Sequence, residues 1–214
     1  MSHACPEEDR GRGRLEWRRG LSNPPRTWAG NALALASLLL IGIAMAAWTW
    51  RTWPDILIDF GREAYVAWRL AEGEVLHKDV VYVSGPLSPY WNALCFRLLG
   101  IGLDTLFIAN AAALGALTVI WFGLLRRSAD RLGAWVACAV FLTLFAFSQY
   151  VGIGNYNYMA PYSHELPHGL LLASLGFLCW DRVARGAGLP WAGAAGLALG
   201  LVALTKIEVF AAAA

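Results

Sequence analysis

Long apolar segments constrain this chain more than any other feature of its sequence. Residues 30–50 and 103–125 each have about the length that an α-helix needs to cross the hydrocarbon core of a bilayer. Hydrophobic residues make up 58% of the chain and charged residues only 15%, too little charge for the surface of an ordinary soluble domain. Eleven tryptophans are typical of helix ends at membrane interfaces. The sequence therefore predicts an all-α polytopic membrane protein.

Three further apolar segments follow the second predicted span. They cover residues 133–150, 163–180 and 190–205, and Pro190 suits the first position of a helix. We therefore expect about five transmembrane helices in one domain over residues 29–214. The sequence ends in apolar residues without a closing charge cluster, so we expect this domain to be truncated.

Basic residues predict the orientation of these spans. They cluster at 10–26, 126–131 and 182–185, which together hold most of the seventeen Lys and Arg residues. With the N-terminus inside, all three clusters face the cytoplasm, as the positive-inside rule requires. Residues 1–28 then form a basic cytoplasmic tail that we expect to be disordered. A basic run can also bind nucleic acid, but next to a span an orientation signal is the better interpretation.

The first span has one alternative, a cleaved signal peptide. Ala44-Met45-Ala46 resembles a cleavage site, but the polar leader is long and further spans follow. A retained anchor is therefore expected, in a multi-pass protein of the cell membrane with its N-terminus in the cytoplasm. A bacterial inner membrane is the expected location.

The outer loop, residues 51–102, is predicted to hold two amphipathic helices. Between residues 56 and 72 one apolar face recurs at helical spacing. After a turn at Ser84-Gly85-Pro86, residues 87–99 repeat the pattern, with polar residues on the opposite face. Both helices are expected to lie flat on the outer leaflet. A transmembrane course for this segment would bury Arg97 and Asp104 in lipid, at roughly 2.5–3.5 kcal/mol each, and is rejected.

Two carboxylates in the first of these helices are candidates for chemistry. Asp59 and Glu63 are four residues apart and so share one helical face, with Arg62 beside them. A carboxylate at the outer leaflet can act as a general base on a hydroxyl group, or ligate a cation. The alternative from spacing alone is a solvated polar face.

A longer pattern surrounds these residues. Asp59-Phe-Gly-Arg-Glu-Ala-Tyr65 is followed by Gly73-Glu-Val-Leu-His-Lys-Asp79 and by Tyr82-Val-Ser-Gly-Pro-Leu-Ser-Pro-Tyr90. Asn155-Tyr-Asn-Tyr158, Pro161-Tyr162 and Leu204-Thr-Lys206 come later in the same order. Most of the chain after residue 50 thus resembles the N-terminal part of the GT-C superfamily of membrane glycosyltransferases, which includes protein mannosyltransferases and aminoarabinose transferases.

The resemblance implies an enzyme that moves a sugar from a polyprenyl-phosphate donor to a lipid or glycan acceptor at the outer face of the membrane. It implies no cofactor, and it leaves open whether the enzyme needs a divalent cation. In this family an acidic residue of the first outer loop serves as base or positions the acceptor, and basic groups near outer helix ends hold the carrier phosphate.

Carried over residue by residue, the resemblance gives Glu63 the place of a family glutamate, while Arg62 stands where relatives have aspartate. Asp59 is therefore the first candidate for the base and Glu63 the second. The substrate-binding candidates are Arg62, Tyr65, Asp79, Tyr162, His164, Glu165 and Lys206. Lys206 lies about 24 Å along the last predicted helix from Pro190, near the far interface, where it could pair with a lipid phosphate or simply snorkel.

Two other patterns are given plain structural interpretations. His164, Glu165 and His168 suggest a metal site, but with no third good ligand we expect polar capping of the fourth span instead. The four cysteines lack metal-ligand spacing. No metal site is therefore predicted.

Two other functions compete with sugar transfer. A transporter or flippase would place ionisable residues or broken helices at mid-membrane, whereas the charges here sit at the span edges. A non-catalytic membrane scaffold, or an inactive fragment, is the remaining alternative.

Overall fold

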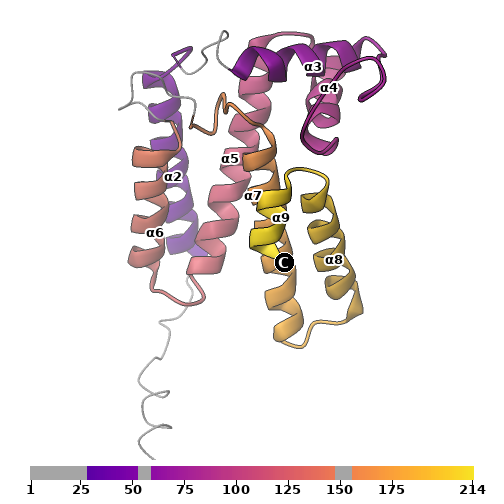
Figure 1. The fold of residues 1–214 in the computed structure, drawn as a ribbon. Helices are drawn as coiled ribbons and strands as arrows, with labels where there is room; N and C mark the ends of the chain where they lie inside the picture. The colour runs from indigo at the N-terminus through magenta and orange to yellow at the C-terminus, as the bar shows by residue number, and fades with distance from the viewer. Residues whose placement is uncertain (1–27, 53–58, 148–155) are drawn as a thin grey trace, which may run out of the picture.

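The computed structural model describes residues 28–52, 59–147 and 156–214, and its regular structure in these ranges is helical (Figure 1). Only an isolated bridge between Leu76 and Val80 departs from this in the described ranges. The predicted all-α class is confirmed. The basic tail, the start of the first outer-loop helix at residues 56–58 and the end of the third predicted span lie outside the described residues.

Five predicted apolar segments each contain a helix. The helices are α2 (Trp28–Trp48), α5 (Leu103–Leu125), α6 (Arg131–Val140), α7 (Glu165–Ala184) and α8 (Leu189–Ala203). A π-helical turn, η2 (Phe141–Phe145), extends α6. Among the described helices, α2 and α5 are long and apolar enough to cross a bilayer, which favours membrane association.

The outer-loop helices α3 (Gly61–Ala71) and α4 (Leu87–Leu99) pack against each other at one end of the bundle (Figure 1). In α4 the polar residues Ser88 and Asn92 are fully buried, whereas Trp91 and Leu98 are exposed. Ala93, Cys95 and Phe96 of α4 are buried as well, so the helix buries a mixed polar and apolar face and exposes large apolar side chains on the other. The two polar residues Ser88 and Asn92 therefore face the protein interior although large apolar residues of the same helix are exposed.

Phe60 fixes the first outer-loop helix to the bundle. Its ring is buried and stacks on Phe107 of α5, with ring centroids 6.2 Å apart. The helix α3 begins one residue later, so its first turn stands directly over the end of α5 (Figure 1). This anchor determines where the side chains of that turn point.

A break between α8 and α9 (Ile207–Ala213) is held by the outer loop. The backbone N–H groups of Gly85 and Leu87 donate to the carbonyl oxygens of Thr205 and Leu204, at 2.8 and 3.0 Å. These carbonyls follow the last turn of α8 and need partners from outside the helix. Gly85 is required by this close approach, since a Cβ atom there would lie 2.1 Å from the Leu204 oxygen.

The Gly85→Ala substitution is expected to destabilise the protein by about 1–3 kcal/mol, the usual effect of overpacking. Thermal unfolding of the purified protein in detergent measures this effect. The matched control is Gly123→Ala in α5, where an added Cβ meets nothing within 4 Å and helix propensity improves. Equal unfolding temperatures for the two variants would show that the contact with Leu204 does not form.

Candidate functional site

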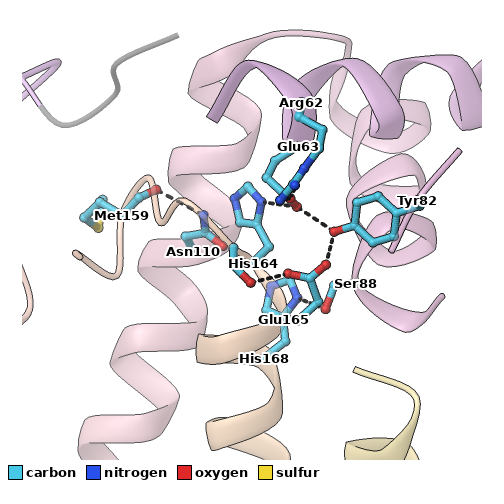
Figure 2. A network of polar contacts seen from close by, with 10 residues as sticks. Arg62, Glu63, Tyr82, Ser88, Asn110, Met159, His164, Glu165 and His168 are labelled. Carbon is cyan, nitrogen blue, oxygen red and sulfur yellow. Dashed lines mark hydrogen bonds and ion pairs between the residues drawn. The ribbon is translucent and has the colours of Figure 1, made fainter. Parts of the chain in front are cut away.

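Glu63 is a buried carboxylate at the centre of a network of polar contacts (Figure 2). It lies in the first turn of α3 and is only 2% exposed. The Arg62 guanidinium donates to its Oε1 at 2.9 Å, and the Tyr82 hydroxyl donates to its Oε2 at 2.9 Å. The Arg62 side chain is 44% exposed, so it covers the carboxylate on the solvent side.

Glu165, the first residue of α7, supplies a second buried carboxylate to the same place. The Ser163 hydroxyl donates to its Oε2 at 2.5 Å. Its Oε1 contacts the Tyr82 hydroxyl, which also contacts Glu63, so Tyr82 bridges the two carboxyl groups (Figure 2). Residues from two distant parts of the chain therefore form one site.

Hydrogen bonds from Tyr82 to both carboxyl groups require one more proton than the phenol hydrogen of Tyr82. A phenol has a single hydrogen to donate, and an ionised carboxylate has none. Since the Tyr82 oxygen contacts both carboxyl groups, it can donate to one and must accept from the other. Both contacts can be hydrogen bonds at the same time only when one carboxyl of the Glu63–Glu165 pair carries a proton. Such a pair can hold or release one proton at a defined position.

Two histidines from the start of α7 flank the carboxylates. His164 occupies the N-cap position of α7, but its side chain makes no capping hydrogen bond. Instead its Nδ1 lies 3.4 Å from Glu63 Oε2, and its ring packs on Phe60. The predicted capping role of His164 is therefore wrong, because its Nδ1 faces the Glu63 carboxylate and does not accept from a backbone N–H of α7. His168 contacts the Ser88 hydroxyl through Nδ1 at 3.0 Å.

Two cations stand beside this network. Lys206 follows the end of α8, in the break that Gly85 stabilises, and its Nζ lies 5.6 Å from the centre of the Tyr162 ring. Both Lys206 and Arg62 act electrostatically on the Glu165 carboxylate. Neither side chain is buried, so each is accessible to a ligand from outside the protein.

Three predicted site residues occupy other positions. Asp59 precedes α3, is exposed and has a left-handed backbone (φ 64°), so it does not extend the helical face of Glu63. Tyr65 is half exposed and packs edge-on against Trp68. Asp79 accepts a hydrogen bond from the Val75 N–H at 2.9 Å and stabilises a turn.

Sequence reasoning gave no role to Tyr82, Ser163 or Ser88. Tyr82 did carry a signal, because it lies between two valines in an extended segment where side chains alternate. Val81 and Val83 are about 90% exposed, while Tyr82 is 5% exposed. A tyrosine turned inward from such a segment needs a buried partner for its hydroxyl.

An apolar cavity of about 490 Å³ lies between α2 and α5, and none of the ionisable residues of the site lines it. Small side chains such as Gly42, Ala46 and Gly115 leave this space, and Met159 closes one part of it. The Met159 carbonyl oxygen accepts a hydrogen bond from Asn110 of α5 at 3.0 Å (Figure 2). The cavity suits a hydrocarbon ligand.

Searches of protein-family models, curated proteins and solved structures find no match to this chain. The resemblance to membrane glycosyltransferases therefore depends on the sequence motifs alone.

Replacement of Tyr82 by phenylalanine is expected to lower the free energy of unfolding by roughly 1–3 kcal/mol, because two buried carboxyl groups lose their shared partner. Chemical unfolding in mixed micelles measures the change. Tyr65→Phe is the matched control, since the Tyr65 side chain is half exposed. A loss no larger for Tyr82→Phe than for the control would argue against the bridge.

Proposed function

We propose that this protein is a membrane glycosyltransferase, which transfers a sugar from a polyprenyl-phosphate donor to a hydroxyl group at the outer face of the membrane. The observation that supports it most is the buried pair Glu63 and Glu165, with Arg62 and Lys206 at its open side. Such a site offers a proton acceptor beside an anion-binding pair of cations, which sugar transfer from a phosphate carrier requires.

The proposal includes a topology of five spans. In addition to α2 and α5, the α6–η2 segment, α7 and α8 cross the membrane, with the basic clusters after α5 and α7 inside. The helices α3 and α4 then lie on the outer leaflet, and the exposed apolar face of α4 rests on lipid. The start of α7 and the break after α8 fall at the same outer face as Glu63.

In the proposed reaction the ionised carboxylate takes the proton of the acceptor hydroxyl. The acceptor oxygen attacks the anomeric carbon of the donor sugar, and the bond from that carbon to the phosphate oxygen breaks. The electron pair leaves with the polyprenyl phosphate, whose charge is stabilised by Arg62 and Lys206. The donor side of the site is thus cationic and the acceptor side acidic.

We assign the base to Glu63 rather than to Asp59. Three side chains contact the Glu63 carboxylate and hold it in place, whereas Asp59 is exposed and precedes the helix. Arg62 covers Glu63, and a donor phosphate would attract the Arg62 guanidinium. Movement of that guanidinium toward the phosphate would uncover the carboxylate only when the donor is bound.

The polyprenyl chain of the donor needs an apolar binding site in the protein. We assign the carrier chain to the apolar cavity between α2 and α5, whose lining is mostly hydrocarbon and includes Met159, the residue whose carbonyl oxygen accepts from Asn110. Its volume falls within the range of ordinary ligand pockets. Tyr162, beneath Lys206, offers an aromatic face near the proposed phosphate position, where a sugar ring could stack.

Transport is the competing function, and one observation favours it. Buried ionisable residues next to a broken helix are typical of secondary transporters. The break between α8 and α9 lies close to Glu165. In transporters such features lie at the bilayer midplane, whereas here the break meets the start of α4, a helix that the proposed topology places at the outer leaflet.

The Glu63→Gln variant is expected to lose at least about a hundredfold in transfer rate, as general bases contribute 10²–10⁴-fold. The assay follows labelled sugar from polyprenyl-phosphate donors to acceptors after reconstitution of the protein into liposomes. Glutamine keeps the size and one hydrogen-bond acceptor of the original side chain, so the loss reports the missing base.

Asp59→Asn is the matched control and is expected to retain most of the activity. Full activity in both variants would show that neither Glu63 nor Asp59 is the base. Solute flux across the liposome membrane without any transfer product would instead support transport.

A further inference from the structure

Exposed arginines gather at the turn between α7 and α8. Arg182 lies in the last turn of α7 and Arg185 is the C-cap residue of that helix, and both residues are exposed. Figure 1 shows this turn at the end of the bundle opposite to α3 and α4. Glu165 begins the same helix, which at about 1.5 Å per residue separates it from Arg182 by about 25 Å. The arginines are therefore distant from the site formed by Glu63 and Glu165.

A single carboxylate neutralises these arginines only in part. Asp181 accepts from Nε of Arg185 through Oδ2 at 2.8 Å, and from a terminal nitrogen of the same guanidinium through Oδ1 at 3.1 Å. Arg127, which follows the end of α5, forms an ion pair with the same carboxylate. Two guanidinium groups thus share one negative charge, so a positive excess remains around Asp181. The ion pairs also connect the ends of α5 and α7.

Arg182 adds a further positive charge, and it has no carboxylate partner within the described residues. Its guanidinium carbon lies 5.1 Å from the centre of the Trp191 ring of α8, a cation–π contact. The ring holds the guanidinium in place without neutralising it. A guanidinium presents its N–H donors in a planar fork, which matches two oxygen atoms of a phosphate group. Arg182 is therefore positioned to bind an anion from outside the protein.

Large apolar side chains accompany these cations. Trp180, Leu189 and Trp191 are exposed at the end of α7 and the start of α8. Tryptophan is enriched at the membrane–water interface, where its ring lies at the level of the lipid headgroups. A phosphate ion in solution would leave these apolar side chains in water. A phospholipid brings its phosphate to the same depth and covers them with its acyl chains, so the combination favours a lipid as the ligand.

We propose that the end of α7 binds the headgroup of an anionic phospholipid, with Arg182 donating to its phosphate group. Pairs of arginine and phosphate are frequently bidentate, which fixes the orientation of the headgroup. The positive excess around Asp181 selects an anionic lipid over a zwitterionic one, and Trp180 and Leu189 contact the acyl chains. Basic pockets between helices at the cytoplasmic side of membrane proteins bind such headgroups. The proposed topology places this turn at that side, but lipid binding does not depend on sugar transfer.

Native mass spectrometry of the full-length protein in detergent tests the proposal. The protein is titrated with phosphatidylglycerol, or with phosphatidylcholine of the same acyl chains. The wild type is expected to bind phosphatidylglycerol at least about fivefold more tightly. Arg182→Gln should remove about fivefold of that affinity and leave the binding of phosphatidylcholine unchanged. Lys78→Gln removes an exposed cation from the outer loop, and as the matched control it should bind like the wild type.

A photoactivatable phosphatidylglycerol gives a readout that does not depend on the folding of any variant. In nanodiscs that contain the wild-type protein, crosslinks mapped by peptide mass spectrometry are expected in residues 177–192. Equal affinity of the wild type for the two lipids, equal losses in Arg182→Gln and Lys78→Gln, or crosslinks confined to other parts of the chain would overturn the proposal. Glycerol phosphate that competes as strongly as the lipid would also overturn it, because the site would then bind soluble phosphates.

Discussion

The hydroxyl group of Tyr82, shared by Glu63 and Glu165, is the interaction on which the site depends. Two carboxyl groups removed from water repel each other when both are ionised, and burial of a single unpaired charge is already costly. A proton within the pair removes one charge, and the phenol lets both groups share a partner. Arg62 then balances the remaining charge from the solvent side.

One short segment brings the distant parts of this site together. Tyr82 reaches the two glutamates, Gly85 and Leu87 hold the chain after α8, and Ser88 contacts His168. Few residues thus connect the outer loop with α7 and with the break that carries Lys206. The backbone contacts of this segment also satisfy carbonyl groups that no helix can satisfy there. Its geometry sets the distance between the acidic and the basic sides of the site.

The helices themselves were predictable, because long apolar segments indicate them directly. The predicted second span and α5 have the same bounds, 103–125. The site was less predictable, since helical periodicity gives the residues that share a face but not what that face packs against. It placed Glu63 beside Asp59 on a polar face, whereas Phe60 anchors α3 so that Glu63 points into the protein and Asp59 precedes the helix. Likewise the local sequence around His164 predicts a cap and not the contact with Glu63, which lies a hundred residues earlier in the chain.

A double-mutant cycle on the two carboxylates tests the central claim, that Glu63 and Glu165 form one coupled unit. The unfolding free energies of the wild type, Glu63→Gln, Glu165→Gln and the double variant are compared in the same micelles. Groups that share a proton and a hydroxyl should show a coupling energy of at least about 1 kcal/mol, within the range of residues in one hydrogen-bond network. Additive effects, within about 0.5 kcal/mol, would show that the two carboxyl groups do not meet.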